Sequence, residues 1–183
     1  MRGDSVMIAN ARRVKIAIFD VDGILTDGGL HYSETGDAMK SFDVRDGMGM
    51  KLLQDTGVEL AIITSRRAAS VRLRAEDLGI RHVQQGVAEK LAAFETLLAA
   101  TGFSPDEAAF LGDDLVDLPV LCRCGFAATV ADAPAALKRR AHYVTQNRGG
   151  HGAAREFCEM IMHSQGTLTT RTSYFLRNTS PRP

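Results

Sequence analysis

Short apolar runs alternate with segments of helical periodicity along most of the chain. Apolar stretches at 15–19, 58–63, 108–111 and 126–130 are typical of strands buried on both faces of a sheet, and shorter strands are expected near 81–84 and 143–145. Between them, apolar residues recur three and four positions apart, which predicts helices over 46–56, 67–78, 88–100, 115–123, 134–140 and from 153 onward. This alternation predicts an α/β fold, a doubly wound parallel sheet of the Rossmann-like type with helices on both faces.

The segment 28–42 interrupts the alternation. Two short stretches with alternating polarity flank the turn-like cluster 33–37, which predicts a β-hairpin. Because it follows the first strand directly, it is placed to lie as a flap over the end of that strand; an ordinary hairpin at the sheet edge is the alternative. Residues 1–13 read as a lead-in and 14–166 as a single domain. Residues 167–183 are rich in Thr, Ser and Arg without a clear period, and we expect a mobile C-terminal tail.

Composition narrows the function classes. The 183 residues suit one domain, and 22 basic residues balance 22 acidic ones, so bulk charge suggests neither a nucleic-acid nor a membrane partner. The apolar runs are too short to span a bilayer and the first residues lack a secretory layout, so we expect a cytoplasmic protein. Three cysteines form no disulfide framework; Cys122 and Cys124 suggest half a metal site or, more simply, reduced and mostly buried thiols.

Two carboxylates end the first predicted strand. Asp20 and Asp22 share one side of an extended chain, and Gly23 then allows the chain to curl. One carboxylate can attack a substrate while its neighbour handles protons. Because close anionic oxygens repel, the pair calls for a cation or a trapped proton, and hard oxygen ligands with open water positions favour Mg²⁺. A chance acidic pair at a polar strand end is the alternative.

Further polar residues follow the other strands. Thr64 ends the strand before the 67–78 helix, where a helix N-terminus favours an anion, although Ser65 could serve only as an N-cap. Lys90, in a first helical turn, opposes the helix dipole, so it binds an anion or is merely solvated. A second acidic cluster, whose helix-capping alternative explains one or two of its members, follows the 108–111 strand: Asp113, Asp114 and Asp117. Parallel strands bring these groups to one sheet edge.

The order of these motifs resembles the haloacid-dehalogenase-like phosphatase superfamily. Phosphoryl transfer needs a nucleophile, charge neutralisation and a metal. The resemblance implies that Asp20 is the nucleophile, Asp22 the general acid and base, and Thr64 and Lys90 the phosphoryl-binding groups. It implies Mg²⁺ bound by Asp20, by Asp113 and by the backbone carbonyl of Asp22.

Over about residues 12–168 the chain is similar to the 3-deoxy-D-manno-octulosonate 8-phosphate phosphatases, in the segments 42–47, 62–66, 112–120 and 149–156. The resemblance implies hydrolysis of that sugar-acid phosphate in lipopolysaccharide precursor synthesis. It implies substrate contacts from Asp22, Asp43, Val44, Arg45, Asp46, Gly47, Lys51, Arg66, Arg74 and Lys90. Four residues depart from the family pattern and put the identity of the sugar in doubt: Asp43, Lys51, Ser65 and His151.

The intervals between these motifs leave no room for a cap domain, so something else must exclude water from the site. The resemblance implies a homotetramer in which the hairpin packs at subunit contacts and a neighbour's C-terminal segment closes the pocket. Three alternatives remain: a phosphatase for a nine-carbon sialic-type sugar acid 9-phosphate, a phospho-accepting receiver-like signalling domain, and a non-catalytic interaction subunit. Retention of Asp20, Asp22, Lys90 and Asp113 argues against the last.

Overall fold

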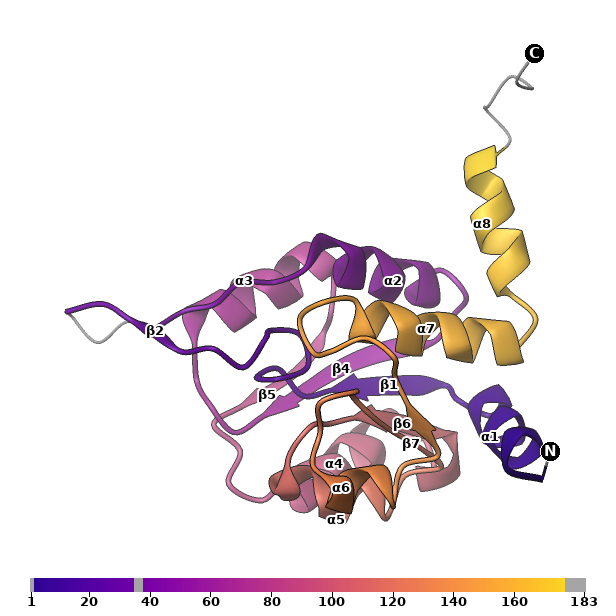
Figure 1. The fold of residues 1–183 in the computed structure, drawn as a ribbon, viewed down its shortest axis with the longest axis horizontal. Coiled ribbons are helices and arrows are strands. Elements are labelled where there is room, and N and C mark those ends of the chain that lie inside the picture. Colours follow the sequence, from indigo (N-terminus) through magenta and orange to yellow (C-terminus); the bar gives the residue numbers. More distant parts are fainter. Residues whose placement is uncertain (1, 35–37, 177–183) are drawn as a thin grey trace.

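Six parallel strands form the central sheet, in the order β5-β4-β1-β6-β7-β8 (Figure 1). The structure is a computed structural model that describes residues 2–34 and 38–176. The strands of the sheet are β1 (Ile16–Phe19), β4 (Glu59–Thr64), β5 (His82–Gln85), β6 (Ala108–Leu111), β7 (Phe126–Thr129) and β8 (Tyr143–Val144). The predicted α/β fold with one doubly wound parallel sheet is confirmed.

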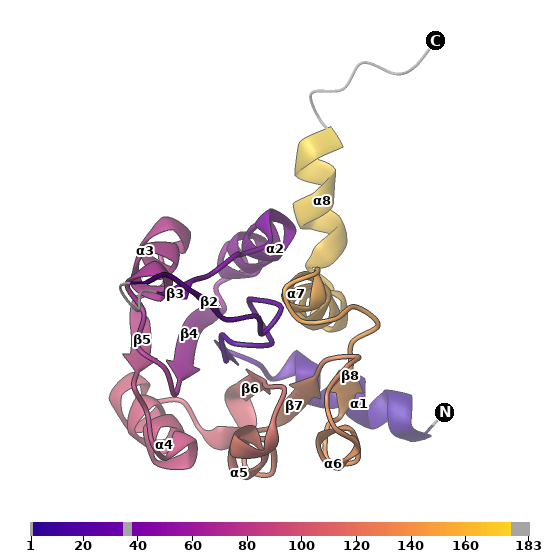
Figure 2. The same cartoon turned by 60° about the vertical axis from the view of Figure 1, so that its left-hand side comes forward.

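Two layers of helices cover the sheet. One face carries α2 (Val44–Gln54), α3 (Ala69–Leu78) and α7 (Ala153–Ser164), and the other carries α4 (Lys90–Thr101), α5 (Leu118–Leu121) and α6 (Ala135–Lys138) (Figure 2). Two short 3-10 helices, η1 (Pro105–Glu107) and η2 (Leu115–Asp117), flank β6. The uninterrupted apolar runs are explained by this arrangement, because every residue of β1, β6 and β7 is buried.

The direction of winding reverses at β1. From β1 the chain builds β4 and β5 on one side, then returns to add β6, β7 and β8 on the other. In the shared register Ile16 pairs with Glu59 of β4 and with Ala108 of β6. The carboxyl ends of these three strands therefore lie side by side, and in open α/β sheets ligands bind at such a reversal.

The ends of the domain contain two helices that were not predicted from the sequence. The lead-in forms α1 (Arg2–Arg12), whose Ala11 is buried and whose Arg12 Nε donates to the carbonyl of Ser164, 2.9 Å away. The predicted tail begins with α8 (Leu168–Leu176), which projects from the end of α7 (Figures 1 and 2). The mobility expected for the tail stays a prediction, and residues 177–183 lie outside the described residues.

The segment after β1 forms the predicted hairpin, with β2 (His31–Tyr32) antiparallel to β3 (Ala38–Met39). These strands make a separate two-stranded sheet, so the alternative of a hairpin on the main sheet edge is wrong. The hairpin projects from the body of the molecule (Figure 1). Residues 35–37 of the predicted turn lie outside the described residues.

The three cysteines are free, with Cys124 and Cys158 buried and Cys122 exposed, which confirms the prediction of unpaired, mostly buried thiols. Among the helices that the structure describes, none combines the length and the apolar character needed to cross a membrane.

Candidate active site

A pocket of about 330 Å³ opens where the chain leaves the carboxyl ends of β1, β4 and β6. Its lining includes every predicted catalytic and metal-binding residue, together with Arg66, Asp114, Ser65, Gly28 and Leu30: Asp20, Asp22, Thr64, Lys90 and Asp113. The topology therefore brings both acidic clusters, the strand-end threonine and the lysine to one place, as predicted.

Asp20 is the first residue beyond β1, and its backbone N–H donates to the carbonyl of Leu111 at 3.0 Å, so the sheet fixes its position. The carboxylate is buried, and Oδ2 lies 2.9 Å from Nζ of Lys90, while Oδ1 has no hydrogen-bond partner among the described residues. Burial raises the pKa of Asp20 to about 6, against the opposing attraction of Lys90. A buried oxygen without a partner is costly unless a ligand or an ion completes it.

Lys90 begins α4 and is buried, so the alternative of a solvated lysine is wrong. Its Nζ donates to Oδ1 of Asp117 at 2.6 Å, in addition to the contact with Asp20. Burial by itself would lower the pKa of Lys90, but the carboxylates of Asp20 and Asp117 outweigh burial and raise it. The lysine is therefore a fixed positive charge inside the pocket.

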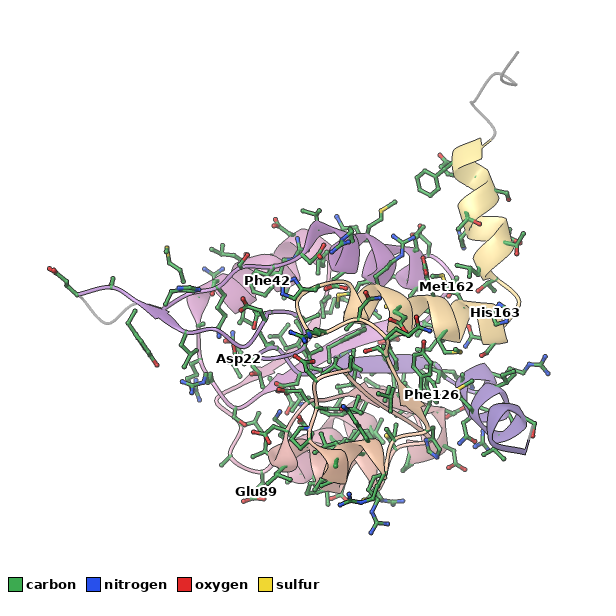
Figure 3. The ribbon with its side chains drawn as sticks, viewed as in Figure 1. Asp22, Phe42, Glu89, Phe126, Met162 and His163 are labelled. Carbon is green, nitrogen blue, oxygen red and sulfur yellow. The ribbon has the colours of Figure 1, made fainter. Side chains whose placement is uncertain are left out.

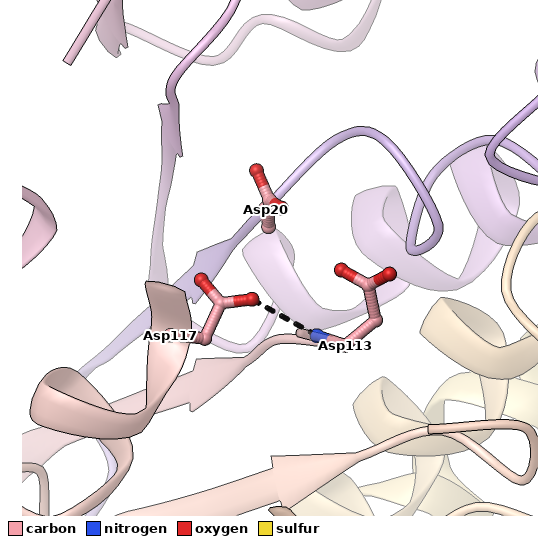
Figure 4. Close-up of side chains that lie close together, drawn as sticks. All are labelled: Asp20, Asp113 and Asp117. Atoms are coloured by element: carbon pink, nitrogen blue, oxygen red, sulfur yellow. Dashed lines mark hydrogen bonds between the residues drawn. The ribbon is translucent and has the colours of Figure 1, made fainter. Parts of the chain in front are cut away.

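Asp117 is a residue of this site whose role the sequence did not predict. It is fully buried, and its Oδ2 accepts from the backbone N–H of Asp113 at 3.0 Å (Figure 4) and from that of Asp114 at 3.2 Å. Its position four residues after Asp113 was visible in the sequence, but a helix-capping role explained it equally well. Both aspartates do cap η2: the side chain of Asp114 accepts from the N–H of Leu115 at 2.7 Å, and Asp117 accepts from the N-cap N–H of Asp114. Asp117 differs from Asp114 in that it also binds Lys90.

The acidic groups fit a divalent cation. Asp20, Asp113 and Asp117 each offer a carboxylate oxygen within 4.8 Å of the others (Figure 4). Burial, and then the neighbouring charges of Asp20 and Asp117, raise the pKa of Asp113 to about 7. Since the oxygens of Asp117 already accept from Lys90 and from backbone N–H groups, Asp20 and Asp113 are the ligands left free for Mg²⁺. The predicted ligation by the backbone carbonyl of Asp22 stays a prediction.

Mg²⁺ is expected to stabilise the protein more strongly as the pH rises through about 6 to 7, because the ion binds the ionised forms of Asp20 and Asp113. Without metal, raised pKa values mean that the folded protein holds protons that the unfolded chain has lost. Asp20 and Asp113 therefore lower the free energy of unfolding progressively as the pH rises from their ordinary pKa of 3.8 to about 6 for Asp20 and about 7 for Asp113.

Thermal denaturation with and without Mg²⁺ across this pH range measures the effect. The Asp113→Asn variant is the control, because it removes one of the titrating ligands and should flatten the dependence. An equal increase in Tm at every pH would contradict the prediction.

Gly23 lets the two acidic clusters approach each other. It has a φ of +82°, and a Cβ atom there would lie 2.0 Å from Oδ2 of Asp113, so a side chain at this position would displace the carboxylate. The carbonyl of Val21 accepts from the N–H groups of Ile24, Leu25 and Thr26, which closes the turn after Asp20. The glycine predicted to curl the chain is therefore also required by packing.

The glycine-rich loop 147–152 supports this turn from behind. Gly150 N–H donates to the carbonyl of Ile24 at 2.8 Å, and a Cβ on Gly149 would lie 1.7 Å from the carbonyl oxygen of Gly23. The loop is held in turn by Glu156 of α7, which accepts from the backbone N–H groups of Gln146 and Asn147 at 2.8 and 3.0 Å. Loop 147–152 and the start of α7 therefore support the turn at Gly23.

Replacing Gly149 with alanine is expected to lower both stability and activity, because the added methyl group must displace the backbone of the Gly23 turn. Such overpacking costs about 1–3 kcal/mol of unfolding free energy. Urea denaturation and phosphate release measure the two effects. Gly29→Ala is the control, since its new Cβ would meet side chains and no backbone among the described residues: Asp27, at 3.0 Å, and His31, at 3.6 Å. Equal behaviour of the two variants would contradict this role of the loop.

The structure does not bring all the predicted substrate contacts to the pocket. Asp43, Val44, Arg45, Asp46, Gly47, Lys51 and Arg74 are outside its lining. Asp43 instead caps α2, and Asp46 accepts from the N–H groups of Gly152 and Arg155 at 3.3 and 2.7 Å, at the start of α7. Arg74 Nη2 donates to the carbonyl of Asp43 at 3.1 Å. Their contact with substrate stays a prediction.

Arg66 and Ser65, by contrast, line the pocket. The N-cap of α3 is Ala68, so the alternative that assigned Ser65 only a capping role is wrong. Ser65 therefore lies in the pocket itself, and its departure from the family pattern stays a prediction.

Comparison with known proteins agrees with this geometry. Residues 82–157 match the family model of the haloacid dehalogenase-like hydrolases. The 3-deoxy-D-manno-octulosonate 8-phosphate phosphatase of Yersinia pestis is 42% identical over 91% of this chain and 89% of that protein.

Solved structures are equally similar. A probable YrbI-family phosphatase from Pseudomonas syringae has a TM-score of 0.94 at 43% identity, over 96% of this chain and 99% of that one. The 3-deoxy-D-manno-octulosonate 8-phosphate phosphatase from Moraxella catarrhalis, solved with a magnesium ion, a phosphate ion and a KDO molecule, has a TM-score of 0.90 at 38% identity, over 92% and 97% of the two chains. With this identity, coverage and pocket, the chain belongs to the 3-deoxy-D-manno-octulosonate 8-phosphate phosphatase family of the haloacid dehalogenase-like hydrolases.

Proposed function

We propose that this chain hydrolyses 3-deoxy-D-manno-octulosonate 8-phosphate to the free sugar acid and phosphate, in lipopolysaccharide precursor synthesis. The observation that carries the proposal is the buried Asp20, with one oxygen bound by Lys90 and the other without a partner in a pocket that also contains Asp113. A carboxylate held in this way is suited to nucleophilic attack on phosphorus. The choice of substrate rests on the relatives that are named 3-deoxy-D-manno-octulosonate 8-phosphate phosphatases.

The reaction proceeds through two displacements at phosphorus. An oxygen of Asp20 attacks, the bond from phosphorus to the sugar oxygen breaks, and Asp22 gives a proton to that leaving oxygen. Asp22 then accepts a proton from the water that attacks the aspartyl phosphate, and the Asp20 carboxylate is regenerated. Thr64 and Lys90 hold the phosphoryl oxygens throughout. Mg²⁺ bound to Asp20 and Asp113 supplies positive charge that offsets the repulsion between the acidic groups and the phosphate.

Arg66 is the residue of the pocket best suited to the acid group of the sugar. Its guanidinium is half exposed at the pocket, and a planar fork pairs well with a carboxylate. The residues at the start of α2, with Lys51 and Arg74, complete the proposed sugar site. Val44 and Arg45 are exposed there, so a ligand or a second subunit can reach them.

A panel of sugar phosphates assayed with Mg²⁺ tests the substrate, and it must include eight- and nine-carbon keto-acid phosphates. The highest kcat/KM on the eight-carbon 8-phosphate supports the proposal. A preference for a nine-carbon 9-phosphate would instead assign the sialic-type alternative, for which Ser65 in the pocket is the relevant departure. A single phosphorylation of Asp20 without repeated phosphate release would indicate a receiver-like domain.

We infer that the active form is the homotetramer that the family resemblance implies, and apolar side chains exposed on two projecting elements support contacts between subunits. On the hairpin, Tyr32 and Met39 are 65% and 73% exposed; on α8, Tyr174 and Phe175 are 68% and 50% exposed. The hairpin would pack at the subunit contacts and a neighbour's C-terminal segment would close the pocket. Light scattering tests this assembly, and a fully active monomer would overturn it.

The free cysteines also favour a cytoplasmic location, which cell fractionation would test.

A further inference from the structure

Lys40 is a buried lysine that neither the sequence pattern nor the reaction described above explains. It follows β3, at the point where the hairpin returns to the body of the molecule, and its side chain is only 2% exposed. Lysines are rarely buried unless their charge is paired. Nζ of Lys40 donates to Oδ1 of Asp22, and this is the only partner of the ammonium group that the described residues provide.

The contact with Lys40 distinguishes the two oxygens of Asp22. Oδ1 is bound by Lys40, while Oδ2 faces Nε of Arg66 at 3.7 Å, which is too long for a hydrogen bond. Oδ2 is therefore the oxygen left free to exchange a proton in the pocket. Asp22 lies at the base of the hairpin (Figure 3), so the position of its carboxylate depends on a residue of the hairpin.

We propose that Lys40 is a positioning residue that holds Asp22 in the orientation needed for proton transfer to the leaving oxygen. The inference rests on the proposed function, because it assigns Asp22 the role of general acid and base. The transferred proton moves from Oδ2 of Asp22 to the sugar oxygen as the bond to phosphorus breaks. Lys40 is not part of the pocket lining, so it acts through Asp22 and does not contact the phosphate.

Leaving groups that differ in their need for a proton separate this role from a structural one. The alcohol of a sugar phosphate leaves slowly unless it is protonated, whereas the p-nitrophenolate of p-nitrophenyl phosphate is stable as an anion. The variants are Lys40→Met, which removes the charge, and Lys40→Arg, which restores it. Lys15→Met is the matched control, because Lys15 pairs with Glu107 at 2.6 Å on the opposite end of the sheet.

The rate at which the leaving group is released in the first turnover is measured by rapid quench. The substrates are p-nitrophenyl phosphate and the sugar phosphate of the panel with the highest kcat/KM. Lys40→Met is expected to slow release of the sugar by about 10–100-fold, part of the usual contribution of general acid catalysis, with KM unchanged. Release of the first p-nitrophenolate should stay within about twofold of the unmodified enzyme. Lys40→Arg should recover most of the lost rate, and Lys15→Met should match the unmodified enzyme on both substrates.

Equal losses on both substrates would assign Lys40 a structural role and overturn the proposal, as would a rise in KM without a change in rate, or no effect at all. If Lys40→Met fails to fold, Lys40→Gln retains a donor to Asp22 without the charge and is subject to the same comparison. An unmodified enzyme that releases phosphate from no substrate would refute the proposed function instead, so the two failures are distinguishable.

Discussion

Replacing Asp20 with asparagine is expected to abolish phosphate release while leaving the fold intact. An amide oxygen is a poor nucleophile, and loss of the carboxylate also removes a ligand of Mg²⁺, so the rate should fall by roughly 10⁴-fold or more. Folding should not suffer, because burial raises the pKa of Asp20 and therefore disfavours its charged form in the folded protein. Phosphate release under saturating substrate, together with thermal denaturation, measures both effects.

The matched control is Asp106→Asn, an exposed aspartate in η1, which precedes β6 at the opposite end of the sheet, and it should retain full activity. Measurable turnover by Asp20→Asn, in a sample whose mass excludes deamidation back to aspartate, would refute the nucleophile assignment. A collapse in the Tm of Asp20→Asn would show that the carboxylate is needed to fold the pocket, and the loss of activity would then carry no information about chemistry.

Asp117→Ala is expected to cause the largest loss of stability in the site. The side chain is fully buried and accepts from Lys90 and from two backbone N–H groups. Removal of Asp117 leaves Lys90 paired only with Asp20 and leaves two backbone N–H groups without their acceptor, and breaking a buried ion pair costs about 3–5 kcal/mol of unfolding free energy. Urea denaturation measures this loss, and phosphate release should fall with it, because Lys90 loses the contact that holds it in place.

Asp114→Ala provides the comparison, since Asp114 is exposed and caps only the short helix η2. Loss of such a cap costs about 1 kcal/mol. Similar stability of the two variants would mean that Asp117 and Lys90 are not a buried pair in solution. The contrast between neighbouring aspartates of one motif separates the support of the pocket from helix capping.

The sequence predicted the central fold well because burial on both faces leaves an unambiguous apolar run, as in β1 and β6. It also placed Asp20, Thr64 and Asp113 correctly, since the ends of parallel strands must meet at one edge. The helices α1 and α8 were missed because their segments were interpreted as a lead-in and a tail, although their apolar residues recur with helical spacing. What stabilises α1 is contact with α7, and that contact is not visible in the local pattern.

The contacts that remained hidden join residues distant in the chain. A lysine at the end of a hairpin resembles any solvated lysine, and only the folded chain pairs Lys40 with Asp22. Asp46 suited a substrate contact by resemblance, whereas in the structure it caps α7 from α2. Asp117 was ambiguous because a capping role satisfied its local sequence. In each case the deciding partner comes from another element.

The contact of Gly149 with the turn at Gly23 has a consequence for the time at which the enzyme becomes competent during its synthesis. A chain emerging from the ribosome presents Asp20 early, whereas the loop that braces the turn after it is translated much later. A nascent chain that stops before residue 149 already contains every charged residue of the pocket lining, and we expect it to be inactive. Charged groups alone would then not make the site competent until the bracing loop has been translated.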